Sequence, residues 1–124
     1  MEISHRRLAD VLIVAPAGRI SHENAEDFRL ALEPHLRRCV AGGDKVVIDL
    51  SGLEYISSAG LRVFMLAAKQ VKAQDGIVVI AAMQQVVREI FEISRFNLLF
   101  ETFGTAAQAL EKLSPGAASA FRAP

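Results

Sequence analysis

The 124-residue chain has a single cysteine and no excess of either charge. Cys39 has no partner for an internal disulfide, and the N-terminal residues lack the apolar core of a signal peptide, so we expect a cytoplasmic protein. Lys and Arg total 14, as do Asp and Glu. Because nucleic-acid binding relies on clustered cations, we expect no direct contact with nucleic acid. No apolar run approaches the roughly 18 residues that a membrane span requires.

The motifs of common catalytic and metal sites are also missing. His5, His22 and His35 lie in separate segments without the spacing of metal ligands, so no metal site is expected. The eight glycines form neither a GxxxxGK[ST] loop nor a GxGxxG turn, which leaves nucleotide and dinucleotide cofactors without support. A hydrolase built from Ser58, His22 and Asp49 remains an alternative, but the sequence has no GxSxG elbow. We therefore expect no cofactor and no enzymatic activity.

Short apolar runs alternate with segments of helical periodicity, which predicts a single α/β domain. Strands are expected at residues 2–6, 11–15, 45–50, 77–81 and 98–100. Helices are expected after Ser21, from residue 57 or 58 to 73, around residues 87–94 and over residues 105–113. The order of elements indicates a four- to five-stranded mixed sheet covered by about four helices. We expect this sheet to be parallel in the middle and to begin with an antiparallel hairpin.

Local signals place the ends of three helices. Ser21 is expected to cap the first helix, because its hydroxyl can accept a hydrogen bond from a first-turn amide. Pro34 falls within the same helical pattern and lacks an amide proton, so it predicts a kink or an early end near Glu33. Thr105 and Gln108 have the spacing of a capping box and mark the start of the last expected helix.

Two adjacent serines, Ser57 and Ser58, lie where a loop meets the second helix. A serine at this position commonly caps the helix. A second, exposed hydroxyl can accept a phosphoryl group, whose charge of about −1.5 to −2 is stabilised by free amides and the helix dipole. If this helix end is also a docking surface, phosphorylation leaves the domain folded and prevents docking. Arg62 is either a solvated helix residue or a partner for the phosphate or for an acidic group.

Residues 47–62, VIDLSGLEYISSAGLR, resemble the STAS family, the domain shared by sulfate transporters and anti-sigma factor antagonists. The resemblance continues at residues 18–20 and 87–96 and keeps the same order along the chain. We therefore expect a STAS domain over residues 1–113 and a flexible tail of small residues over 114–124. No transporter segment precedes the match in this sequence, so the stand-alone antagonists are the branch it resembles most.

For that branch, the resemblance implies a partner-switching cycle. The unphosphorylated antagonist binds an anti-sigma factor that is also a GHKL-type serine kinase, and the sigma factor is released. Phosphorylation breaks this complex, and a PP2C-type serine phosphatase restores it. The family's acceptor lies in an Asp-Ser-Ser/Thr-Gly-Leu pattern that aligns with Ser58. This chain has Ser57 at the aspartate position and Ala59 at the next Ser/Thr position, and Ser57 is the alternative acceptor.

The resemblance also implies a surface that contacts the partner. Its residues are Ser21, Ser57, Ser58, Ala59, Gly60 and Arg62. Ser21 stands where many antagonists have an acidic residue, which predicts a change in docking specificity. The alternative function is a STAS adaptor module that is never phosphorylated and works within a signalling or lipid-transport complex.

Overall fold

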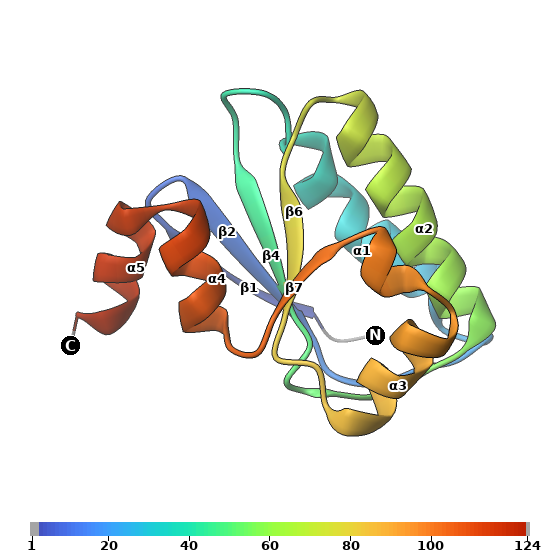
Figure 1. Ribbon diagram of the computed structural model, residues 1–124. Helices are drawn as coiled ribbons and strands as arrows, with labels where there is room; N and C mark the ends of the chain where they lie inside the picture. The colour runs from blue at the N-terminus through green and yellow to red at the C-terminus, as the bar shows by residue number, and fades with distance from the viewer. Residues whose placement is uncertain (1–2, 124) are drawn as a thin grey trace.

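A twisted mixed sheet forms the centre of the computed structural model, which describes residues 3–123 (Figure 1). Its strands, in spatial order, are β1 (Ile3–Leu8), β2 (Val11–Pro16), β4 (Lys45–Asp49), β6 (Val78–Ala81) and β7 (Glu101–Phe103). β1 pairs antiparallel with β2, and all the other neighbours are parallel. The predicted mixed sheet with an antiparallel N-terminal hairpin is therefore confirmed. The first strand was expected to begin at Glu2, which lies outside the described residues.

Helices cover both faces of this sheet. They are α1 (Ala25–Arg37), α2 (Ser58–Ala73), α3 (Gln85–Ile93), the 3-10 turn η1 (Phe96–Leu98), α4 (Ala106–Leu113) and α5 (Pro115–Arg122). The first three α-helices lie on one side of the sheet, and α4 and α5 lie on the other (Figure 1). Among residues 3–123, no helix combines the length and the apolar character needed to cross a membrane.

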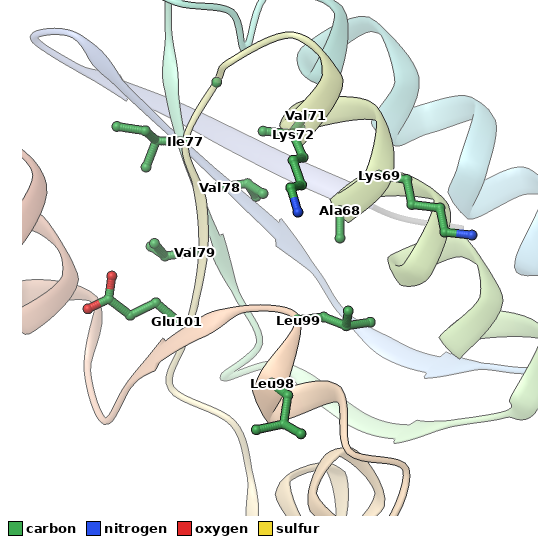
Figure 2. Close-up of a pocket in the computed structure, with 11 residues that line it drawn as sticks. Ala68, Lys69, Val71, Lys72, Ile77, Val78, Val79, Leu98, Leu99 and Glu101 are labelled. Carbon is green, nitrogen blue, oxygen red and sulfur yellow. The ribbon is translucent and has the colours of Figure 1, made fainter.

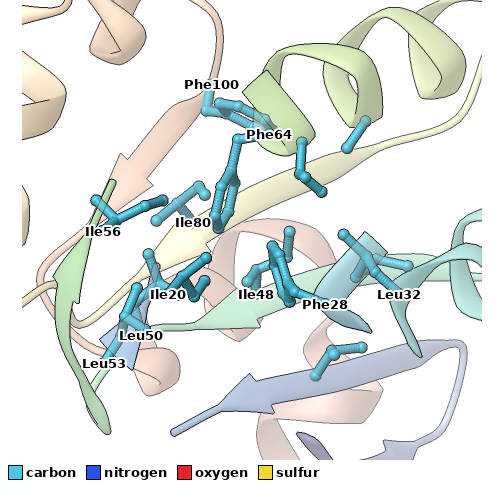
Figure 3. Packing of buried hydrophobic residues seen from close by; sticks show 14 of the residues in the cluster. Ile20, Phe28, Leu32, Ile48, Leu50, Leu53, Ile56, Phe64, Ile80 and Phe100 are labelled. Carbon is cyan, nitrogen blue, oxygen red and sulfur yellow. The ribbon is translucent and has the colours of Figure 1, made fainter. Parts of the chain in front are cut away.

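The larger core is organised around Phe64, a fully buried residue of α2 (Figure 3). Its ring centroid lies 5.4 Å from that of Phe28 in α1, 5.5 Å from that of Phe91 in α3 and 6.1 Å from that of Phe100. Aromatic pairs at these separations contribute beyond the area that they bury. The cluster therefore joins three helices and the segment before β7 to one face of the sheet.

Helix α1 differs from its prediction at both ends. It begins at Ala25, with Asn24 and not Ser21 at the N-cap position. Asn24 closes the preceding turn instead, because its Oδ1 accepts a hydrogen bond from the Ser21 amide at 2.7 Å. The alternative of an early end near Glu33 was also wrong, since the helix continues to Arg37 with Pro34 inside it. Pro34 lies on the exposed side of the helix, where the carbonyl left without an amide partner can be hydrated.

The end of the sheet is shifted along the sequence. The strand expected at residues 98–100 is wrong, because η1 and the segment after it occupy these residues and the strand itself is β7. Phe100 is 4% exposed and packs against Phe64. The residue directly before β7 therefore belongs to the core contact and not to the strand. β7 then pairs with β6 through Val79 and Glu101. The predicted cap of α4 is confirmed, since Thr105 Oγ1 accepts a hydrogen bond from the Gln108 amide.

Residues 115–122, expected to be a loose tail, form helix α5. Ser114 caps it by accepting a hydrogen bond from the Ala117 amide at 3.2 Å, and Pro115 occupies the first turn, where a missing amide proton is tolerated. Ala117 and Ala118 are buried beside Leu8 of β1. The small side chains that suggested disorder therefore allow a close approach of the helix to the sheet.

Replacing Ser114 by Ala is expected to lower the free energy of unfolding by about 1 kcal/mol through loss of the cap. The Ser114 hydroxyl also donates to Asp10 Oδ1 at 2.6 Å, and this bond lowers the pKa of Asp10. A carboxyl group whose pKa is lower in the folded state than in the unfolded state stabilises the fold at pH values above its unfolded-state pKa. This contribution to stability is lost as the pH falls through the folded-state pKa. The deficit of the Ser114→Ala variant should therefore shrink in acid below about pH 4.

Urea unfolding at several pH values measures this difference. Ser119→Ala is the matched control, because Ser119 is exposed on the same helix and its loss should change stability by less than about 0.5 kcal/mol. Equal stability of the two variants at neutral pH would contradict the assigned cap.

Candidate functional site

A short parallel pair of strands, β3 (Gly18–Ile20) and β5 (Leu53–Ile56), supports the predicted site. Ile20 is paired with Ile56, so the residues that follow the two strands leave the pair side by side. The Ser57 amide donates a hydrogen bond to the Ile20 carbonyl at 2.8 Å. This pairing brings the loop at Ser21 to the start of α2, as the grouping of the predicted site residues requires.

Gly60 allows α2 to lie directly on these strands. A Cβ atom at this position would lie 2.6 Å from Ile20 Cγ2 and 2.7 Å from Ile56 Cγ1, closer than side chains pack. Gly60 is itself buried. The structure thus gives Gly60 a packing role beneath the predicted contact surface.

The two serines occupy different environments. Ser57 is 6% exposed, and its Oγ accepts a hydrogen bond from the Gly60 amide at 3.2 Å, so the expected serine cap is confirmed at this residue. Ser58 is the first residue of α2 and is exposed. Within residues 3–123, the amides of Ser58 and Ala59 donate to no protein group. The helix end therefore has one exposed serine and, among the described residues, two amides without a protein acceptor.

Two guanidinium groups lie on the elements of this site. Arg62 is exposed one helical turn after Ser58, a spacing that places both residues on the same side of α2. Arg19 of β3 stacks its guanidinium over the ring of Tyr55, 4.6 Å from the ring centroid. Together with the positive end of the α2 dipole, these cations favour an anionic group at the surface.

The structure does not assemble the alternative hydrolase site. Asp49 Oδ1 accepts a hydrogen bond from the Ser51 amide at 2.9 Å. Among the described residues, neither Asp49 nor His22 is hydrogen-bonded to the Ser58 hydroxyl, and no three His, Cys, Asp or Glu side chains are grouped to hold a metal ion. The arrangement at Ser58 can accept a group or a partner, but it places no general base beside the hydroxyl.

A hollow of about 560 Å³ lies elsewhere, between the C-terminal half of α2, β6 and the segment before β7 (Figure 2). Its walls are largely apolar, with Lys69 and Lys72 on the helix side and Glu101 on the strand side. None of the predicted site residues lines it. Ser58 and Arg62 are exposed and lie outside this hollow, a setting that suits contact with another protein more than enclosure of a small molecule.

Sequence reasoning missed the stacked pair of Arg19 and Tyr55. β3 and β5 contain three and four residues, too few to show a strand periodicity. The stacking also depends on the register that places Arg19 opposite Tyr55. The detectable signal was the STAS-like segment at residues 18–20, which contains Arg19.

Replacing each serine by Ala is expected to separate the two roles. Ser57→Ala removes a buried cap and should lower the free energy of unfolding by about 1 kcal/mol. Ser58→Ala removes an exposed hydroxyl and should change it by less than about 0.5 kcal/mol. Denaturant unfolding of the two variants makes the comparison, and a larger loss for Ser58→Ala would reverse the assignment.

Known proteins resemble the chain in sequence and in fold. BtrV of Bordetella bronchiseptica, which is named as an anti-sigma factor antagonist, is 38% identical over 100 residues that cover 81% of this chain and 84% of that protein. The crystal structure of a protein from Thermotoga maritima that is also named as an anti-sigma factor antagonist has a TM-score of 0.80 at 21% identity. The match covers 90% of this chain and 93% of that one. The phosphorylated form of SpoIIAA from Bacillus has a TM-score of 0.66 at 13% identity, covering 91% and 100%.

At these identities the two structural likenesses show a shared fold. The family assignment rests on the sequence, in which the STAS domain family matches residues 2–109 and BtrV gives independent agreement. The chain belongs to the STAS domain family.

Proposed function

We propose that the chain is an anti-sigma factor antagonist that works by partner switching. In its unphosphorylated form it binds an anti-sigma factor with GHKL-type serine kinase activity, and the sigma factor is released. Phosphorylation of Ser58 ends this binding, and a PP2C-type phosphatase reverses the modification. The relatives named as antagonists support this class, in which a protein acts by binding and is not itself an enzyme.

The observation that carries the proposal is the difference between the two adjacent serines. Ser57 is buried and its hydroxyl is engaged by the Gly60 amide. Ser58 is exposed, so its hydroxyl is accessible to a kinase without any unfolding of α2. Ser57 therefore supplies the helix cap, and the hydroxyl of Ser58 is left available for modification.

A phosphate on Ser58 is compatible with the folded domain. It would lie at the positive end of the α2 dipole, next to the unpaired amides of Ser58 and Ala59 and one turn from Arg62. In a protein complex the same group would have to lose its water, which is strongly unfavourable unless the partner supplies matching donors. The modification thus acts on the complex and leaves the fold intact.

The proposed docking surface consists of Ser21, Ser58, Ala59 and Arg62. Ser21 and Ala59 are half-buried and Arg62 is exposed. Ser57 and Gly60 support this surface from below. Because the residue before the acceptor is a serine instead of an aspartate, the surface is less acidic than the family pattern, and a partner with acidic groups opposite Arg62 fits it.

Titration calorimetry with the GHKL-type anti-sigma factor of the same organism tests the proposal. Ser58→Asp places a negative charge at the docking surface and should weaken binding at least about fivefold, or ~1 kcal/mol. Ser58→Ala should bind as the unmodified protein does. Ser119→Asp makes the same charge change at an exposed position of α5, across the sheet from α2, and should have no effect.

Equal affinity of Ser58→Asp and Ser58→Ala would contradict the switch. It would favour the alternative, a STAS adaptor whose binding does not respond to charge at this position.

A further inference from the structure

A second polar site lies between β1 and the C-terminal part of α1. It is a hollow of about 530 Å³, a volume typical of sites for small molecules. Its lining residues are His5, Arg7, Leu12, Pro34, His35 and Arg38. None of them belongs to the surface around Ser58, so this hollow is independent of the proposed function.

The pleat of β1 divides its side chains between two environments. His5 and Arg7 point toward α1 and line the hollow. Arg6 and Leu8 point toward the other face, where the Arg6 guanidinium lies 5.6 Å from the ring centroid of Phe121 and Leu8 packs beside α5. Alternation along one edge strand therefore delivers two basic side chains to the hollow.

The two histidines of the hollow are in contact. The ring centroids of His5 and His35 lie 5.0 Å apart, with the rings inclined at 47°. Partial burial lowers the pKa of His35, and electrostatic interaction with the neighbouring His5 and Arg38 lowers it further. Two imidazolium rings at this distance would repel each other, and an anion between or beside them would offset that repulsion.

The carboxylate of Asp44 acts on two of the basic groups beside the hollow, because its pKa is lowered first by its bond to Arg7 and also by the charge of Arg38. Arg7 is engaged, because its Nη1 and Nη2 donate to the two carboxylate oxygens of Asp44 at 2.9 and 2.8 Å. Within residues 3–123, the side chains of His5, His35 and Arg38 form no hydrogen bond or ion pair with protein groups. The neighbouring carboxylate of Glu33 faces Arg37 on the outside of α1, at 3.3 Å.

We propose that this hollow binds a small doubly charged oxyanion of the phosphate or sulfate type, held by Arg38 together with the protonated rings of His5 and His35. His5, His35 and Arg38 line the hollow together, none of them hydrogen-bonded to another protein group within residues 3–123, and a charge of −2 offsets the repulsion between the rings. Leu12 and Pro34 complete the lining of the hollow. Binding is coupled to proton uptake and is therefore stronger in acid.

Histidine NMR on the full chain tests this site, with sodium sulfate as the probe and sodium chloride at equal ionic strength as the reference. Sulfate keeps its charge between about pH 5 and 8, where histidine titrates, so any pH dependence comes from the protein. Sulfate should move the imidazole resonances of His5 and His35 beyond the effect of chloride. His22, exposed in the loop before α1, is the internal control and should respond equally to both salts. As the pH increases, the dissociation constant of sulfate should rise by up to about tenfold per pH unit for each proton that binding takes up.

Two neighbouring arginines provide matched variants. Arg38→Ala should weaken sulfate binding at least about tenfold, because it removes a charged donor of the site. Arg37→Ala removes an exposed arginine that is paired with Glu33 and should leave binding unchanged. Equal effects of the two variants, or equal shifts of all three histidines, would show an adventitious ion only and overturn the proposal. Absence of any sulfate-specific shift at His5 and His35 would also overturn it.

Discussion

Helix α2 rests on the strands β3 and β5 only because residue 60 has no side chain. A Cβ atom there would lie 2.6 Å from Ile20 Cγ2. Beside this contact, the Ser57 amide donates to the Ile20 carbonyl and the Ser57 hydroxyl accepts from the Gly60 amide. Since Ser57 is thereby buried, Ser58 is the first residue of the helix to face solvent. The proposed acceptor therefore lies next to a buried cap and a closely packed glycine.

The chemistry of the helix end follows from the same contact. It offers an accessible hydroxyl, two free amides and a nearby Arg62, features that accept negative charge. Among the described residues, no base is hydrogen-bonded to the hydroxyl. The hollow at His5 and His35 is a second position suited to negative charge, on a different pair of elements. One is suited to covalent modification and the other to reversible binding of an anion.

The long, strongly periodic elements could be predicted from the sequence, including the buried strand at residues 45–50 and the helix that starts at the paired serines. Elements that depend on contacts between distant parts of the chain could not be predicted from the sequence. β3 and β5 are too short to show a period, and the alanines of α5 become informative only when the sheet face that they cover is known. At the site, the serine cap was predictable from helix chemistry, whereas the stacking of Arg19 on Tyr55 required the strand register.

The central claim is that Ser58 carries a regulated phosphate. Site-resolved phosphopeptide mass spectrometry on protein isolated from its native cells, growing and stressed, tests it most directly over residues 55–62. The account predicts phosphate on Ser58 with an occupancy that changes between conditions, and none on the buried Ser57. An unmodified Ser58 in every condition would contradict the switch, and phosphate found on Ser57 instead would contradict the assignment of roles to the two serines.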